Sequence, residues 1–283
     1  MYEVDKQEIG INKNWMEIMS AVSSVQPVST SQDRVESRSS AGSERTAMNQ
    51  AVGTVIAARN LGKSIDDRKI LLGIDLEIAR GDFVALLGAN GAGKTTLLKI
   101  IAMLSPATEG VLELFGAEVG RDQSAVRKRL GLIGHGMMLY RDLGIMENLI
   151  FFGKLYGVAR SRERAEELLY KVGLHHRRLD AVSTLSRGMS QRASIARALM
   201  HDPEVLLADE PFAGLDAPST SMLEKMLLEL HDSGKTIVLV NHHIPQSLDL
   251  VDRAVVLRKG RIVINKRADE LTSAEVLKEV GAV

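Results

Sequence analysis

The sequence contains no cysteine among its 283 residues. This absence excludes disulfide bonds, thiolate metal sites and cysteine nucleophiles, and it is typical of proteins from a reducing compartment. The positive charges of 36 lysines and arginines are balanced by 36 aspartates and glutamates. A chain without net charge gives no reason to expect binding to nucleic acid or to an anionic membrane surface. We therefore expect no nucleic-acid partner.

Long apolar segments are missing as well. No run approaches the roughly 18 apolar residues that a membrane-spanning helix needs, and the N-terminus lacks the apolar core of a signal peptide. From these two absences we expect the chain by itself to be soluble and cytoplasmic.

The first 51 residues differ in composition from the rest. Eight serines lie between residues 23 and 43, among glutamine, aspartate, arginine and glutamate, and no helical or strand period persists there. This composition predicts a disordered tail over residues 1–51, followed by one folded domain over residues 52–283. Residues 15–22 can form a short helix that contacts a partner; the alternatives are a solvated extension or a true start at Met48.

From residue 54 onward the sequence has the pattern of a packed α/β domain. Ile74, Leu76 and Ile78 alternate with acidic residues, which predicts a half-buried strand. Helices are predicted at 97–104, ended by Ser105-Pro106, and at 146–156 and 162–172, the last two inside a helical insert over about residues 140–190. Because helical patterns also separate the later strands, the sheet should be parallel with right-handed crossovers. Apolar runs predict these further strands at 83–87, 110–115, 205–208, 236–240 and 254–257.

One segment carries a complete phosphate-binding pattern. It follows the apolar run 83–87 and precedes a helical pattern that begins near Thr95. Glycine is needed where backbone N–H groups turn inward around a polyphosphate, because a Cβ would block the approach. Lys94 is expected to reach the β- and γ-phosphates, and the Thr95 hydroxyl to reach Mg²⁺. The predicted nucleotide-binding residues are Gly88, Ala89, Asn90, Gly91, Ala92, Gly93, Lys94, Thr95 and Thr96.

Two carboxylates, Asp209 and Glu210, follow the apolar strand 205–208. Open parallel sheets bind ligands at the carboxyl ends of their strands. We expect Asp209 to hold Mg²⁺, mostly through water, and Glu210 to polarise the water that attacks the γ-phosphate. A nucleoside triphosphate and Mg²⁺ are therefore the predicted cofactors.

A third motif, at residues 185–192, reads Leu-Ser-Arg-Gly-Met-Ser-Gln-Arg at the start of a predicted helix. Ser186 and Gly188 offer an anion a hydroxyl, N–H groups and the positive end of the helix dipole, and Ser186 also suits the helix cap. With the two motifs above, this octet resembles the signature of the ABC ATPase family, although Arg187 and Met189 replace its usual first glycine and glutamine. The resemblance spans about residues 55–264. It implies an α/β fold, a P-loop NTPase (ABC ATPase) core with a parallel sheet, an antiparallel β element and a helical insert subdomain.

The same resemblance implies how the site is completed. In this family the signature serves the opposite subunit, so Ser186 and Gly188 should act in trans, in a head-to-tail homodimer with ATP between the subunits. Asp216 lies in the segment 213–216, which resembles the family's dimer-contact loop. His242 resembles the switch histidine that contacts the γ-phosphate and aligns Glu210, whereas family members usually carry aspartate at the position of His243. The implied catalytic residues are Glu210, His242 and Lys94.

Two positions depart from the family pattern. Where the family has a glutamine that binds Mg²⁺ and senses the membrane subunit, this chain has His135, a third candidate metal ligand beside Thr95 and Asp209. An imidazole can still make one hydrogen bond or bind a metal through its neutral nitrogen. Near Ile65 the family usually stacks an aromatic ring on adenine. An aliphatic side chain cannot stack, which predicts loose base selectivity.

The segments around His135 resemble one branch of the family. His135, residues 139–143 and 147–149, the signature and residues 209–216 resemble the ATPase subunit of the haem exporter of cytochrome c maturation. Related drug and polysaccharide exporters share much of this pattern, so another exporter is the alternative. The implied partner is an integral membrane permease, which would hold the ATPase at the cytoplasmic face of the membrane. Residues 137–140 would form part of a groove for a permease helix, or else pack within the insert.

Two other classes fit less well. Soluble ABC proteins of translation or DNA repair usually have two fused ATPase domains, a long coiled coil or zinc-binding cysteines, and this chain has none of these. A nucleotide-binding regulator without hydrolysis is opposed by the presence of Glu210 and His242. The sequence therefore favours a transport ATPase.

Overall fold

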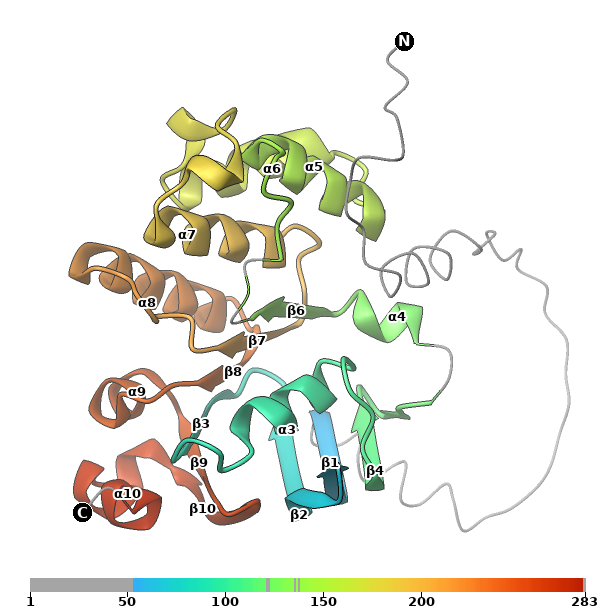
Figure 1. Ribbon diagram of the computed structural model, residues 1–283, viewed down its shortest axis with the longest axis vertical. Coiled ribbons are helices and arrows are strands. Elements are labelled where there is room, and N and C mark those ends of the chain that lie inside the picture. Colours follow the sequence, from blue (N-terminus) through green and yellow to red (C-terminus); the bar gives the residue numbers. More distant parts are fainter. Residues whose placement is uncertain (1–52, 121–122, 135, 137, 282–283) are drawn as a thin grey trace, which may run out of the picture. The chain divides into compact units, whose positions relative to one another are not determined.

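The computed structural model describes residues 53–120, 123–134, 136 and 138–281. This part of the chain is an α/β fold with two sheets and surrounding helices (Figure 1). The predicted tail, with Met48, lies outside the described residues, as do His135 and Met137. The strands are β1 (Thr54–Ile65), β2 (Arg68–Ala79), β3 (Phe83–Gly88), β4 (Glu109–Leu114), β5 (Ala117–Glu118), β6 (Leu130–Ile133), β7 (Val205–Asp209), β8 (Thr236–Val240), β9 (Arg253–Arg258) and β10 (Arg261–Arg267).

The larger sheet has six strands in the order β10-β9-β3-β8-β7-β6. All neighbours pair in parallel except β10, which runs antiparallel to β9. Every residue of β3, β7 and β8 is buried. Strands covered on both faces are mainly apolar, so these strands appear in the sequence as nearly continuous apolar runs, with the polar residues Asp209 and Thr236 at the ends of β7 and β8.

The smaller sheet is antiparallel, in the order β2-β1-β4-β5. In β2 the predicted alternation is confirmed, because Ile74, Leu76 and Ile78 are buried while the acidic residues between them are exposed. The buried face packs with helix α3 (Lys94–Ile101) and with inward residues of the larger sheet in one hydrophobic cluster. Helix α3 therefore contacts both sheets.

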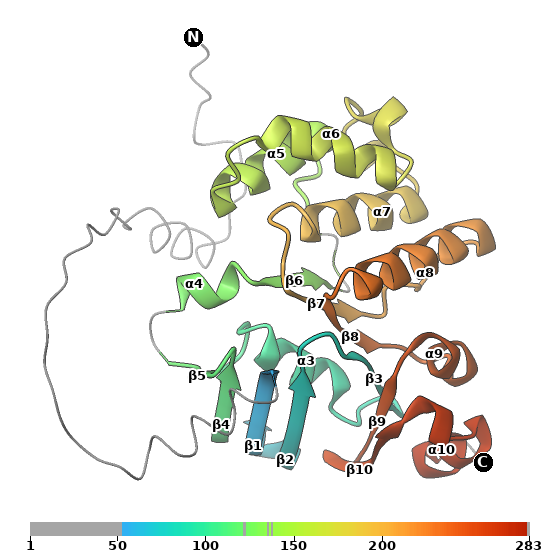
Figure 2. The same ribbon diagram turned by 180° about the vertical axis from the view of Figure 1, so that it is seen from behind.

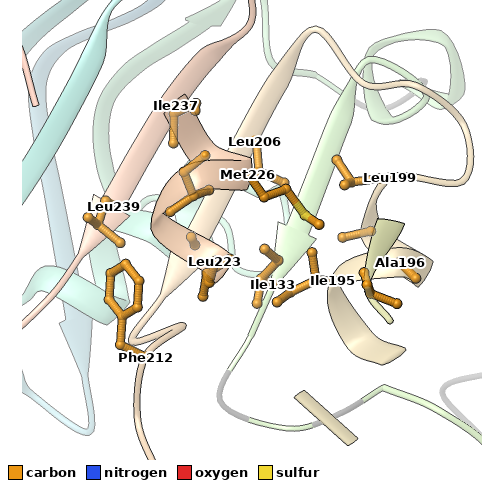
Figure 3. Close-up of a cluster of buried hydrophobic side chains, with 14 of the residues drawn as sticks. Ile133, Ile195, Ala196, Leu199, Leu206, Phe212, Leu223, Met226, Ile237 and Leu239 are labelled. Atoms are coloured by element: carbon orange, nitrogen blue, oxygen red, sulfur yellow. The ribbon is translucent and has the colours of Figure 1, made fainter. Parts of the chain in front are cut away.

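The other face of the larger sheet is covered by α8 (Ala217–Asp232), α9 (Ile244–Leu250) and α10 (Ser273–Val280), which follows the short turn η3 (Ala268–Glu270). Residues of β3 alternate between the two clusters, with Phe83, Ala85 and Leu87 on this side. Figure 3 shows Leu223 and Met226 of α8 among the side chains of β6, β7 and β8. This packing holds the carboxyl ends of the parallel strands at one edge.

Between β6 and β7 the chain forms a helical layer. It consists of α5 (Ile145–Tyr156), α6 (Ser161–Lys171), the turns η1 (His175–Arg177) and η2 (Val182–Thr184), and α7 (Arg187–Ala198); the short α4 (Ser124–Arg127) precedes β6. Helices α5, α6 and α7 pack against one another, and α7 also contacts β6 (Figures 1 and 2). The predicted insert over about residues 140–190 contains α5 and α6, but the layer continues through α7 to Ala198.

Three elements end earlier than predicted, among them the helix predicted over 162–172, which ends at Lys171. The helix predicted over 97–104 ends at Ile101, because Met103 adopts a φ of 57° and the Leu104 N–H bonds back to the carbonyl of Lys99. The strand predicted over 110–115 ends at Leu114. None of the described helices is long and apolar enough to cross a membrane.

Candidate nucleotide-binding and hydrolysis site

The phosphate loop joins the end of β3 to the start of α3. Gly88 has a φ of 147°, and a Cβ there would lie 2.3 Å from the carbonyl oxygen of Leu257 on the neighbouring β9. Gly93 has a φ of 107°, and a Cβ there would lie 2.6 Å from Cδ2 of Leu71. Glycine is therefore required at both positions. The close approach of β9 and β2 determines this backbone path.

Lys94 is the first residue of α3 and its side chain turns back toward the loop. The Nζ atom donates to the carbonyl oxygens of Gly88 (2.7 Å) and Ala89 (3.0 Å), and the residue is only 5% exposed. Burial lowers the pKa of the Lys94 ammonium, while the carboxylates of Glu210 and Asp209 oppose this shift. Because a phosphate oxygen is a stronger, charged acceptor than a carbonyl, a bound polyphosphate can replace these two contacts.

Asp209 lies at the end of β7 and is 6% exposed. Its Oδ1 accepts a hydrogen bond from the Thr95 hydroxyl at 3.1 Å, which joins the phosphate loop to the second predicted motif. A carboxylate and a hydroxyl are the hard oxygen donors that Mg²⁺ prefers, and Mg²⁺ usually takes few protein ligands beside water and phosphate. The described residues contain no group of three or more histidine, aspartate and glutamate side chains arranged to hold a metal. The Thr95–Asp209 pair thus fits a magnesium ion shared with a nucleotide.

Glu210 follows Asp209 and leaves the strand with a φ of 52°, unusual for a residue with a side chain. Its N–H donates to the carbonyl of Val240, which ties it to the end of β8 (2.9 Å). Its Oε1 lies 2.5 Å from Nε2 of His242, which follows β8. The two neighbouring strand ends therefore bring a carboxylate and an imidazole into direct contact.

Two buried residues that were not predicted hold the His242 backbone. Asn241 accepts from the N–H of His242 through Oδ1 (2.8 Å), and its Nδ2 donates to Oγ of Ser247 (3.0 Å). The Ser247 hydroxyl donates to the carbonyl of His243 (2.8 Å), and Ser247 has no exposed surface. The sequence signal for Asn241 was its position directly before the predicted His242. Its partner Ser247 lies six residues later and belongs to no motif, so no sequence pattern indicated it.

The signature residues lie at the start of α7. Ser186 caps the helix by accepting from the Met189 N–H (3.3 Å), as predicted, and Gly188 lies in the first turn. Gln191 donates through Nε2 to the carbonyl of Pro211 (3.0 Å), directly after Glu210. The signature helix is therefore bonded to the segment that carries the catalytic candidate.

The exposed Arg187 covers the loop that precedes α8. Its guanidinium lies against Gly214, where a Cβ would be 2.5 Å from Nε of Arg187. Asp216 caps α8 by accepting from the Ser219 N–H (3.0 Å), and hydrogen bonding from the Ser219 side chain and backbone lowers the pKa of Asp216. Asp216 thus has a structural role beside the predicted dimer contact.

Two cavities meet at Glu210. One of about 440 Å³ lies between Glu210, the glycines that follow β6, and the first part of α7, including Arg187 and Gln191. The other, of about 610 Å³, lies between Glu210, α8, and the loop with His242 and His243. Glu210 is therefore accessible from both sides.

The structure groups five predicted residues at the strand ends, namely Lys94, Thr95, Asp209, Glu210 and His242. Ser186 and Gly188 lie on α7 instead, in the helical layer. Ile65 ends β1 beside the turn to β2 and is 47% exposed. His135, the third candidate metal ligand, is outside the described residues.

Comparisons with known proteins agree with this geometry. A family model described as "ABC transporter" matches residues 71–213. The chain is 33% identical over 211 residues to the linearmycin resistance ATP-binding protein LnrL of Bacillus subtilis (strain 168), a match that covers 74% of this chain and 68% of the relative. It is 37% identical over 237 residues to the daunorubicin resistance ATP-binding protein DrrA3 of Streptomyces coeruleorubidus, covering 81% and 75%. It is 39% identical over 239 residues to the sulfate/thiosulfate import ATP-binding protein CysA of Xylella fastidiosa (strain Temecula1), covering 81% and 68%.

Solved structures show the same fold. One, of the ATP-binding subunit of an ABC transporter, has a TM-score of 0.75 and 26% identity, and the match covers 81% of this chain and 100% of that chain. Another, a dimeric ATP-binding cassette in a post-hydrolysis state with ADP and phosphate bound, has a TM-score of 0.70 and 28% identity, covering 75% and 98%.

Proposed function

The chain belongs to the ABC transporter family, as an ATP-binding subunit whose ATP hydrolysis is coupled to transport, and on this premise we propose which residues bind the nucleotide and which catalyse its hydrolysis. The contact between Glu210 and His242, beside the Thr95–Asp209 pair, carries the proposal. These four groups come from the ends of β7 and β8 and from the phosphate loop. They meet where a γ-phosphate would extend from the loop.

The loop residues and the N-terminal N–H groups of α3 bind the phosphates, and Lys94 exchanges its two carbonyl contacts for the β- and γ-phosphates. Thr95 and Asp209 would hold Mg²⁺, which neutralises phosphate charge when bound. Glu210 takes a proton from the attacking water, whose oxygen bonds to the γ-phosphorus while the bond to the β–γ bridging oxygen breaks. The imidazole of His242 holds the Glu210 carboxylate in place. His135 is the proposed third contact near the metal.

Two copies of this chain are proposed to form the working ATPase. Each copy carries a phosphate loop on α3 and a signature on α7, so a head-to-tail pair can assemble two complete sites. Ser186 and Gly188 would then bind the nucleotide of the other copy, and Asp216 would lie at the contact. The likeness to a dimeric ATP-binding cassette supports this arrangement. We also propose that residues 1–51 form a tail separate from the ATPase domain.

The remaining partner is proposed to be an integral membrane permease that holds the subunit at the cytoplasmic face. Two of the relatives described above are resistance proteins and one is an import protein, so relationship alone leaves the direction of transport open. We propose export. The drug-resistance relatives favour a drug-like cargo, and the resemblance of the segments after His135 favours haem.

The function is tested by ATP hydrolysis of the purified protein and of Glu210→Gln. The amide keeps the shape of the side chain but cannot take a proton, so turnover should fall by about 10²–10⁴-fold. ATP binding should remain, and ATP should shift the variant to a dimer in size-exclusion chromatography. Lys94→Ala is the matched comparison, which should lose ATP binding and remain monomeric. Unimpaired hydrolysis by Glu210→Gln would refute the assignment of the base.

The cargo is tested with the copurified permease complex in lipid vesicles. Hydrolysis is measured with haem, with daunorubicin and without addition, using Glu210→Gln as background. Stimulation by haem alone supports the haem assignment, and stimulation by daunorubicin alone supports the drug alternative. Equal rates in all three conditions would refute both cargo proposals.

A further inference from the structure

Strand β6 is the outer strand of the larger sheet, and one of its edges has no neighbouring strand in the described part of the chain. The Arg129 carbonyl, just before β6, accepts N–H groups from Glu204 and Val205 at the start of β7. Because backbone direction alternates along a strand, the carbonyls of Leu130 and Leu132 point to the opposite, open edge. A buried carbonyl at a sheet edge needs another donor.

Arg197, in the last turn of α7, supplies the first donor. Its Nη2 atom donates to the carbonyl of Leu132 at 2.7 Å. The residue is 6% exposed and forms no ion pair with the described residues, and burial lowers the pKa of its guanidinium to about 10. A buried arginine without a carboxylate is costly, so simple stabilisation is a poor reason for its presence.

His201, three residues beyond α7, supplies the second donor. Its Nε2 lies 2.9 Å from the carbonyl of Leu130. Since a carbonyl only accepts, the proton must be on Nε2, and burial lowers the pKa of His201, which favours this neutral form. The end of α7 is therefore bonded to two successive outward carbonyls of β6.

Two aromatic side chains on one face of α5 cover these donors. The Arg197 guanidinium lies 5.6 Å from the ring centroid of Phe152, and the His201 ring stacks on Tyr156 at 3.9 Å. Phe152 and Tyr156 are four residues apart and so share a helix face. We call the four residues Arg197, His201, Phe152 and Tyr156 the edge clamp.

Helix α7 joins this clamp to the catalytic segment. In the N-terminal half of α7, Gln191 donates to the carbonyl of Pro211, the residue after Glu210. Gln191 and Arg197 are six residues, or about 9 Å, apart on a rigid helix. Glu210 has a strained backbone and borders the cavity between α7 and the loop that follows β6. A tilt of α7 at the clamp would therefore move Pro211 and with it Glu210.

We propose that Arg197 and His201 are positioning residues, which anchor α7 on the edge of β6 so that Gln191 holds Glu210 in its hydrolytic position. The inference rests on the proposed role of Glu210. It assigns a function to a buried cation and a half-buried imidazole that lie outside the sequence motifs. The clamp should therefore act on the rate of hydrolysis and leave nucleotide affinity unchanged.

The first test is Arg197→Met, which keeps the volume of the side chain and its contact with Phe152 but removes the donor. We expect kcat to fall at least fivefold, with ATP affinity within error of wild type. Arg164→Met is the matched control, because Arg164 also donates to a carbonyl at the end of α7, that of Leu199 (3.2 Å), but does not contact β6. This control should keep the wild-type kcat.

The position of α7 is measured independently of hydrolysis. Because the chain has no cysteine, spin labels can be attached at Ser183→Cys before α7 and Lys99→Cys on α3, both exposed positions. We expect one narrow distance distribution in wild type and in Arg164→Met, and a broader or shifted one in Arg197→Met. A folded Arg197→Met with wild-type kcat, or with lower kcat and unchanged distances, would overturn the proposal.

If Arg197→Met does not fold, a second pair of variants decides. His201→Gln keeps an N–H donor and should retain kcat, whereas His201→Phe keeps the stacking on Tyr156 without the donor and should lower kcat. Equal kcat values in this pair would overturn the proposal. If wild type itself hydrolyses no ATP, the proposed function fails, while the distance measurement still tests the clamp.

Discussion

The side chain of Ser247 should determine both stability and turnover, although it lies outside every motif. Its hydroxyl accepts from Asn241 Nδ2 and donates to the His243 carbonyl, at 3.0 and 2.8 Å, in a fully buried place. Asn241 in turn accepts from the backbone of His242, which contacts Glu210. Ser247→Ala removes the first hydrogen bond of this series without changing a residue that contacts the nucleotide.

The expected loss of stability follows mainly from Asn241, because the variant leaves one buried N–H of its amide unpaired, at a cost of about 1–3 kcal/mol. The His243 carbonyl loses the hydroxyl but still accepts from the backbone N–H of residue 247 at 3.0 Å. We therefore expect the free energy of unfolding to fall by about 2 kcal/mol. In a domain of this size that corresponds to a fall in Tm of about 4–8 °C.

Turnover should fall about tenfold, the equivalent of roughly 1.4 kcal/mol in the activation barrier, because a mobile Asn241 no longer fixes His242 against Glu210. The ATP dissociation constant should not change. Urea unfolding and steady-state hydrolysis measure the two effects. Ser233→Ala is the control, since its hydroxyl bonds one carbonyl, that of Leu230, at the exposed end of α8. Wild-type stability and kcat in Ser247→Ala would refute the reasoning.

Three further predictions concern other parts of the chain. A hydrogen bond from Arg129, with a second from Arg80, lowers the pKa of Glu204 from 4.5 to about 2. The stability that the Glu204 carboxylate contributes should therefore be complete above pH 4.5 and lost as the pH falls toward 2. In urea unfolding, Glu204→Gln should lower the free energy of unfolding by about 1 kcal/mol at pH 7, a value discounted for the partial exposure of Glu204, and by less at pH 3. Wild type should prefer ATP over GTP by less than about a hundredfold, ~2.7 kcal/mol, in competition binding, and Ile65→Tyr, which supplies a ring that can stack on the base, should tighten ATP binding by up to about 1–3 kcal/mol; a larger preference in wild type contradicts this. Gly88→Ala should abolish ATP binding measured by calorimetry, because its Cβ would lie 2.3 Å from a carbonyl, while Gly120→Ala, with open space around it, should bind normally.

Local sequence patterns were sufficient to predict the fold class and the residues whose side chains the structure groups at the candidate site. The strands β3, β7 and β8 are apolar except at Asp209 and Thr236, because both of their faces are covered. Gly88 and Gly93 of the phosphate loop lie where a Cβ would collide with β9 and β2. Each of these requirements acts on a few consecutive residues, so it appears directly in the sequence.

The supporting contacts depended on tertiary structure. Arg197 bonds a carbonyl 65 residues earlier in the chain, and Arg129 contacts a carboxylate 75 residues later. Even the six-residue link between Asn241 and Ser247 needs α9 to turn back on the end of β8. The sequence by itself was sufficient to predict the groups that we propose for hydrolysis, because their types and spacing are dictated by chemistry over short segments. Only the packing of distant elements decided which side chains hold those groups, because any buried donor of suitable length can satisfy an open carbonyl once the helix is in place.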